Sequence, residues 1–148
     1  QRLKENNIEL PVPVEPSGNY KPYKRVGNLL YFSGQGPFWN NKPKYYGKVG
    51  KDLTKEEGYE AARISAIDLI ATLKDAIGDL DSVKQFVNIK GYVNSADDFY
   101  DQPYVINGFS DTIMLLFGEK GEHSRCALAT NTLPLNMAVE VEMIVEVE

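Results

Sequence analysis

The C-terminal residues 138–148 alternate between apolar and polar side chains. The apolar positions are Val139, Val141, Met143, Val145 and Val147, and Glu140, Glu142, Ile144 and Glu146 stand between them. A period of two indicates a β-strand that is buried on one face. A second strand-like run precedes Leu133-Pro134 and carries Arg125 near its start. If these two runs pair or lie close together, Arg125 and Glu142 point toward one region of space.

Two other stretches show the spacing of amphipathic helices. The first begins at Thr54, where Thr-Lys-Glu-Glu forms a capping box, and we expect it to stop at Gly78. The second begins between Asp101 and Pro103, because proline is tolerated in the first turn, and ends at Gly118. The predicted buried faces are Tyr59, Ala62, Ala66, Ile70, Leu73 and Ile77 in the first helix, and Ile106, Phe109, Ile113 and Leu116 or Phe117 in the second.

Shorter patterns predict the remaining strands. Residues 23–36 are typical of a hairpin that turns at Gly27-Asn28, and Gly34 then allows another group to approach the backbone closely. Residues 82–94 predict a strand in which Val83, Val87, Ile89 and Val93 share a face. The lysine- and tyrosine-rich stretch 38–52 reads as a long loop with one short strand around residues 45–49.

These elements predict an α+β domain with a single mixed sheet and both helices packed on one face. The proline-rich residues 1–19 form an extended N-terminal arm, and residues 20–148 form one domain. The sheet face away from the helices carries glutamates together with Asn88, Tyr92 and Ile144. Such a mixed surface can meet solvent or another subunit.

The composition narrows the chemistry. Asp and Glu outnumber Lys and Arg by 21 to 16, for a net charge of −5, and this balance argues against a nucleic-acid surface because basic contacts to phosphate dominate such binding. One histidine and one cysteine argue against a zinc site and leave no intramolecular disulfide. The free thiol fits a reducing compartment, so we expect a cytoplasmic protein. No apolar run approaches the roughly 20 residues that span a bilayer.

Four segments together resemble the Rid family, which is also labelled YjgF or endoribonuclease L-PSP and has a chorismate mutase-like fold. They are GNLLYFSGQGP at 27–37, the capped helix, HSRCALATNTLP at 123–134 and VEVEMIVEV at 139–147. The likeness covers residues 20–148. The long arm, the extra residues at 101–104 and the segment FGEKGEHSR at 117–125 resemble a divergent YjgF-like branch.

The resemblance implies a homotrimer in which three sheets form a central barrel and ligand clefts lie between subunits. It also implies hydrolysis of a 2-imino or enamino acid to a 2-oxo acid and ammonia, without a cofactor. In active family members an arginine holds the substrate carboxylate, and a glutamate on the last strand positions the attacking water. By spacing from Leu133-Pro134, we match these two residues to Arg125 and Glu142.

Five further residues match substrate contacts of the family. Ser33 and Gly34 lie in the SGQ motif, Asn107 lies on the second helix, and Tyr20 matches an early tyrosine for which Tyr23 is the alternative. Ala127 stands where the family often has a cysteine, so the resemblance implies a backbone contact there and no thiol contact.

The residues leave other functions open. A trimer that only binds small carboxylates would use the same Arg125, and an RNA-cleaving protein is what one family label suggests. The acidic balance, the single histidine and the lack of a basic aromatic platform oppose RNA cleavage. Taken alone, Arg125 could form an ordinary surface ion pair, Glu142 could be solvated like Glu146, and Ser33 could simply end a strand.

Overall fold

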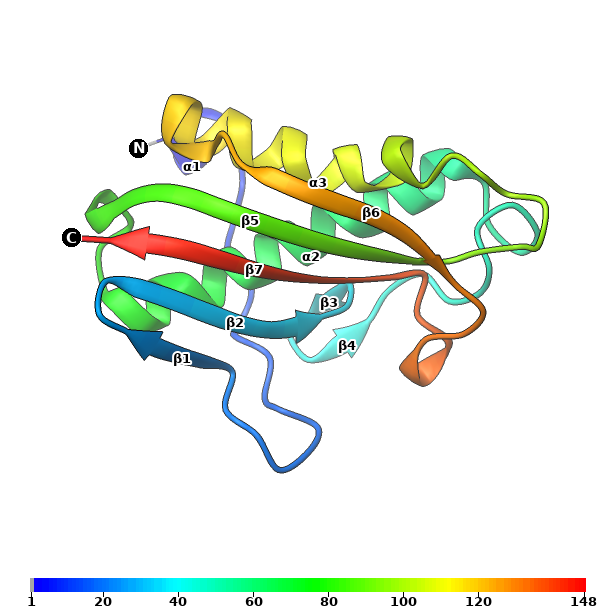
Figure 1. Cartoon of the computed structure of the whole chain (residues 1–148), viewed down its shortest axis with the longest axis horizontal. Coiled ribbons are helices and arrows are strands. Elements are labelled where there is room, and N and C mark those ends of the chain that lie inside the picture. The colour runs from blue at the N-terminus through cyan, green and yellow to red at the C-terminus, as the bar shows by residue number, and fades with distance from the viewer. Residues whose placement is uncertain (1) are drawn as a thin grey trace.

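A mixed five-stranded sheet forms the centre of the computed structural model, which describes residues 2–148. Its strands are β1 (Tyr23–Val26), β2 (Leu29–Gln35), β5 (Val83–Asn94), β6 (Ser124–Thr130) and β7 (Val139–Val147), and they lie in the order β1-β2-β7-β5-β6. Only β5 and β6 are parallel, and the other neighbours are antiparallel. Both long helices, α2 (Lys55–Ile77) and α3 (Gln102–Phe117), pack on one side of the sheet (Figure 1), which confirms the predicted α+β fold.

The two strands on either side of Leu133-Pro134 are not neighbours. β5 lies between β6 and β7, and β6 is an edge strand of the sheet. The connection from β5 through α3 to β6 is the parallel crossover, and it brings the start of β6 alongside α3. Strand β7 has the predicted alternation, with all its odd-numbered residues buried and its even-numbered residues on the open face.

The helix ends were predicted correctly. The Thr54 hydroxyl accepts the Glu57 backbone N–H at 3.1 Å, and the Glu57 carboxylate accepts the Thr54 N–H at 3.0 Å, so both halves of the capping box are formed. Gly78 ends α2 with φ of 81°, and Gly118 follows α3 with φ of 61°. The buried part of α2 is wider than one stripe and includes Ser65, because the sheet, α3 and the segment of β3 (Phe38–Trp39) all pack against this helix.

The segment after β2 differs from the prediction. We expected a strand near residues 45–49, but the paired residues are β3 (Phe38–Trp39) and β4 (Lys42–Pro43), joined by Asn40 and Asn41 in left-handed conformations. Residues 45–49 make only single bridges, such as the one between Tyr46 and Met137. The Asn-Asn pair supplies the two positive φ angles that a tight hairpin requires.

The expected shared face of β5 was also wrong in one position. Val83, Ile89 and Val93 are buried, but Val87 is only half-buried and Phe86 takes its place in the core. The register between β5 and β7 shifts between Val83 and Gln85 and again between Phe86 and Asn88. Irregularities of this kind change which side chains face the core, and a strict period of two cannot anticipate them.

The arm lies along the body of the domain and contains a short helix, α1 (Arg2–Glu5), that we did not expect from its prolines. Ile8 is buried in the core, and Leu3 and Leu10 pack against it. Farther along, the Val12 N–H donates to the Asn40 side chain at 2.9 Å, which ties the arm to the β3–β4 turn. Within residues 2–148, no helix has both the length and the apolar character needed to cross a membrane.

Candidate functional site

The predicted site residues form two separate groups in one chain. Arg125 and Ala127 lie on β6 with their side chains toward α3, which carries Asn107. Ser33 and Gly34 lie near the end of β2, and Tyr20 precedes β1. Strands β7 and β5 separate β2 from β6, so the two groups occupy different parts of the molecule (Figure 1).

Arg125 is held against the outer face of α3. Its Nη1 donates to the Ser110 hydroxyl at 3.1 Å, and its Nη2 donates to the Pro103 carbonyl oxygen at 3.2 Å. Because Asn107 lies four residues after Pro103 and three before Ser110, it shares this helix face. No carboxylate of residues 2–148 lies within 4.0 Å of the guanidinium, so its charge is free to bind an anion.

The second group lines a cavity of ≈ 740 Å³. Its walls come from the arm, the end of β2 and the start of β7, and they include Tyr20, Ser33, Gly34, Phe38, Met137 and Glu140. This volume lies within the range of about 300–1,000 Å³ that is usual for small-molecule sites. Tyr20 contributes to the wall, whereas Tyr23 is not a lining residue and packs on Phe32, so Tyr20 is the better placed of the two tyrosines.

Glu140 is the acidic group of this cavity that has a perturbed pKa. Burial and the neighbouring charge of Glu142 raise the pKa of Glu140 above its ordinary value of 4.5. A β-carbon at position 34 would lie 2.9 Å from a Glu140 carboxylate oxygen, so glycine at that position leaves the space that the carboxylate occupies. The Glu140 side chain therefore meets the β2 backbone where Gly34 was predicted to allow close approach.

Glu142, the predicted catalytic residue, lies two residues farther along on the same open face of β7. Its carboxylate accepts a hydrogen bond from the Tyr92 hydroxyl at 3.4 Å and lies 4.0 Å from the Lys90 ammonium. It lines a smaller cavity of ≈ 190 Å³ and is not part of the wall shared by Ser33 and Gly34. Within one chain, Arg125 faces α3 and Glu142 faces the open side of the sheet.

The sequence did not single out Glu140, because the alternation of β7 gives Glu140, Glu142 and Glu146 the same face. What distinguishes Glu140 is that Gly34 is its neighbour on β2. Which residue of β2 lies beside Glu140 depends on the register of β2 against β7. This register is irregular between Phe32 and Gln35, next to Gly34. The only signal in the sequence was the pair of glycines at 34 and 36.

Ser33 has a defined role within the chain. Its hydroxyl donates to the Lys21 carbonyl oxygen at 2.6 Å, which holds the segment between the arm and β1 beside the cavity. Since a serine hydroxyl has one proton, Ser33 can offer a ligand only its acceptor lone pairs. It therefore both holds the segment that carries Tyr20 and contributes an oxygen to the cavity wall.

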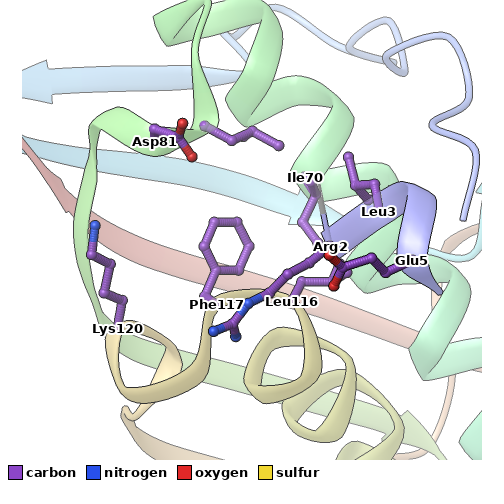
Figure 2. A pocket seen from close by; sticks show the side chains of 9 residues that line it. Arg2, Leu3, Glu5, Ile70, Asp81, Leu116, Phe117 and Lys120 are labelled. Carbon is purple, nitrogen blue, oxygen red and sulfur yellow. The ribbon is translucent and has the colours of Figure 1, made fainter.

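A further cavity of ≈ 430 Å³ lies between α1, the end of α3 and the turn that precedes β5 (Figure 2). Its lining includes the apolar Leu116 and Phe117, the basic Arg2 and Lys120, and two carboxylates, those of Glu5 and Asp81. None of the predicted site residues lines it. Among residues 2–148, no cluster of three or more His, Cys, Asp or Glu side chains could hold a metal ion.

Comparisons with known proteins place these features in context. A family model described as "YjgF/chorismate_mutase-like, putative endoribonuclease" matches residues 1–147. Protein TCP17 of Trypanosoma cruzi is 42% identical over 147 residues, which are 99% of this chain and 90% of that protein.

Two solved structures are similar over almost the whole chain. A protein of unknown function from Agrobacterium tumefaciens is 39% identical with a TM-score of 0.93, over 99% of this chain and 91% of that one. A "putative endoribonuclease" from Shewanella oneidensis MR-1 is 38% identical with a TM-score of 0.96, over 99% of this chain and 97% of that one.

Proposed function

Because the chain belongs to the YjgF/chorismate mutase-like family, also called the Rid family, we propose that it is a cofactor-free hydrolytic deaminase of 2-imino and enamino acids or related small carboxylates. The products are a 2-oxo acid and ammonia. The observation that carries the proposal is the partly desolvated Glu140 carboxylate in a cavity large enough for such a substrate. The absence of an anionic partner for Arg125 among residues 2–148 also supports it, because Arg125 can then bind the carboxylate end of the substrate.

The proposed reaction begins with the substrate carboxylate on Arg125. A guanidinium presents N–H donors in a fixed planar fork, which suits bidentate binding of a carboxylate. The Asn107 side chain on the same face of α3 is placed to contact the bound acid. Because the C=N carbon is bonded to the carboxylate group, binding of the carboxylate also fixes the position of the C=N carbon in the site.

Glu140 then acts as general base on a water molecule. The water oxygen attacks the carbon of the protonated C=NH2+ group, one water proton passes to the Glu140 carboxylate, and the nitrogen becomes an NH2 group on a tetrahedral carbon that bears a hydroxyl. Glu140 returns the proton to this nitrogen, the C–N bond breaks, and ammonia leaves as the hydroxyl releases its proton to solvent and the C=O bond forms. A raised pKa suits this double role, because the carboxylate must accept and then release a proton near neutral pH.

Glu142 has a supporting role in this proposal. Its negative charge raises the pKa of Glu140, while its contacts with Tyr92 and Lys90 keep it at a distance from the cavity. The position that the sequence assigned to catalysis thus tunes the catalytic group beside it.

The proposal includes a homotrimer with clefts shared between copies. Arg125 lies by the edge strand β6 and the cavity opens beside β2, so a single chain keeps the carboxylate clamp and the base apart. In a closed ring of three copies, each edge bearing Arg125 can meet the cavity of the next copy. The open sheet face would then be covered, including the exposed Tyr31 and Leu128.

The proposal is tested by ammonia release. An amino-acid oxidase generates 2-imino acids in place, and the protein is added while the 2-oxo acid and ammonia are followed. We expect faster release than in buffer for at least one amino acid, and loss of the acceleration in Arg125→Ala. No acceleration across a panel of apolar, polar and acidic amino acids would reject the deaminase proposal.

The alternative is a trimer that binds small carboxylates without turnover, since Arg125, which has no acidic partner among residues 2–148, suffices for binding. Calorimetry with 2-oxo acids should show binding by Glu140→Gln in both cases. The ammonia-release assay separates the two functions, because Glu140→Gln abolishes a measurable reaction only if the protein is a deaminase. The net charge of −5 weighs against RNA cleavage, the activity that the descriptions of the family model and of the Shewanella protein give as putative.

A further inference from the structure

A continuous chain of hydrogen bonds runs from the loop before β6 to Arg125. His123 Nδ1 lies 2.5 Å from the Gly121 carbonyl oxygen, and His123 Nε2 lies 2.9 Å from the Ser110 hydroxyl oxygen. The same hydroxyl oxygen is 3.1 Å from Arg125 Nη1, and Arg125 Nη2 continues to Pro103. Histidine, serine and arginine come from three different places, namely the turn after α3, α3 itself and β6.

The direction of two hydrogen bonds in this chain follows from its ends. The Gly121 carbonyl can only accept, so His123 Nδ1 carries a proton and donates it. Arginine can only donate, so Ser110 accepts from Arg125. The direction of the bond between them depends on the tautomer, and Ser110 donates its hydroxyl proton to Nε2 when Nδ1 carries the only ring proton.

We propose that Ser110 and His123 are positioning residues that aim the Arg125 guanidinium at the substrate carboxylate. The inference rests on the deaminase and carboxylate-binding function proposed above. Neither residue needs to touch the substrate. His123 fixes the direction of the Ser110 hydroxyl, and Ser110 fixes the orientation of Arg125.

The chemistry of the partners explains why this arrangement suits an anion clamp. An arginine is often held in place by a carboxylate, but that partner would compete with the substrate carboxylate for the same charge. Here the guanidinium is held by a neutral hydroxyl and a neutral carbonyl oxygen. Of its five N–H donors two are used in this way, so three remain for the ligand.

The chain of hydrogen bonds through His123, Ser110 and Arg125, called the relay below, also lowers the entropic cost of binding the substrate. A free arginine side chain has many rotamers, and it loses this conformational entropy when a ligand orders it. Two hydrogen bonds to α3 order it beforehand, so less of that cost falls on the binding step. Ser110 and His123 are both half-buried, which shields the relay from competing water.

The test compares Ser110→Ala with Ser110→Thr, which keeps a hydroxyl, and with His123→Phe. The matched control is Ser124→Ala, because Ser124 precedes Arg125 directly but bonds to Val87 and Asn88 on the open face. Binding of pyruvate, used as a 2-oxo acid probe, is measured by calorimetry, and the order of the Arg125 side chain is followed through its Nε–H NMR signal without ligand.

We expect Ser110→Ala to weaken pyruvate binding by roughly tenfold, which is the scale of one hydrogen bond to a charged group, and to broaden the Arg125 Nε–H signal. His123→Phe should do the same to a smaller extent, while Ser110→Thr and Ser124→Ala stay near the parent. In turnover, the loss should appear in KM more than in kcat, because the clamp acts at the carboxylate and not at the reacting carbon.

Two outcomes separate this inference from the proposed function. An unchanged affinity and an unchanged Nε–H signal in a folded Ser110→Ala protein would overturn the relay while leaving the deaminase proposal intact. If the parent neither binds 2-oxo acids nor accelerates imine hydrolysis, the proposed function fails. The NMR comparison then still decides whether Ser110 and His123 order Arg125.

Discussion

Glu140 is the residue on which the proposed chemistry most depends. Replacing it with Gln keeps the size of the side chain and removes its ability to accept a proton from water. We expect kcat for imine hydrolysis to fall by about 100-fold or more, the usual range for loss of a general base. Carboxylate affinity should change little, because Arg125 is untouched. Steady-state kinetics and calorimetry on Glu140→Gln measure the two effects separately.

Glu142→Gln is the matched comparison, and it carries its own pH prediction. The raised pKa of Glu140 means that its active, ionised form is lost as the pH falls through a value above 4.5. Because the charge of Glu142 contributes to that rise, removing it should move the acidic limb of kcat/KM to lower pH. An acidic limb at the same pH in both proteins, or a larger loss in Glu142→Gln than in Glu140→Gln, would return the catalytic role to Glu142.

Asp68 gives a prediction about stability. It is fully buried in α2, and the one hydrogen bond of its carboxyl group among residues 2–148 is from the Phe38 N–H at 3.0 Å. Burial raises the pKa of Asp68 to about 8. Below about pH 4 the carboxyl is protonated in both the folded and the unfolded chain. As the pH rises from 4 toward 8, only the unfolded chain releases the proton, so the free energy of unfolding falls by roughly 1 kcal/mol per pH unit.

Asp68→Asn has no proton to lose and keeps an oxygen that can accept from Phe38. We therefore expect it to be more stable than the parent at pH 7.5, with a difference that shrinks toward pH 5. Urea unfolding at both pH values checks this. A difference that is the same at both pH values would show that the folded protein holds Asp68 ionised.

At the scale of the elements, the contact between α2 and α3 depends on Gly108. A β-carbon at this position would collide with the backbone carbonyl oxygen of Tyr59 on α2, and backbone cannot move aside as a side chain can. Gly108→Ala should lower the free energy of unfolding by about 1–3 kcal/mol or more, although alanine is the better helix former. Leu115 on the same helix is exposed, so Leu115→Ala is the control: its free energy of unfolding in urea should stay within about 0.5 kcal/mol of the parent value.

The regular elements could be predicted because local patterns determine them. The Thr54 capping box, the stop at Gly78 and the alternation of β7 each follow from a few neighbouring residues. The register shifts in β5 depend on contacts with β7, which is distant in the sequence, so they did not follow from spacing. The β3–β4 hairpin is local, but its two-residue strands are too short to show a periodic pattern.

The same limit explains the candidate site. The sequence pointed to Arg125 and to the SGQ motif, whose local residues are distinctive. It pointed to Glu142 as the catalytic glutamate, whereas the proposal of Glu140 depends on which glutamate lies opposite Gly34 across the sheet. The sequence could not show that Ser110 lies between His123 and Arg125, because α3 and β6 meet only in the folded chain.

At the scale of the whole molecule, the separation of Arg125 from Glu140 makes the assembly part of the proposed mechanism. Strands β5 and β7 stand between β6 and β2, so a single copy places the proposed carboxylate clamp on one edge and the proposed base at the other side of the sheet. If neighbouring copies of a ring share each site, every site takes Arg125 from one copy and Glu140 from the next.

Mixing two inactive variants tests this arrangement. The Arg125→Ala and Glu140→Gln proteins are unfolded in denaturant, combined in equal amounts and refolded together. Light scattering then measures the size of the assembly. Random mixing in a ring leaves about a quarter of the shared sites with both original residues, so the mixture should regain up to about a quarter of the parent activity. If each site is built within one copy, no site in the mixture holds both residues, and the mixture stays as inactive as its components. Recovered activity in a refolded mixture of three-copy assemblies would thus show that the functional unit is the contact between two chains.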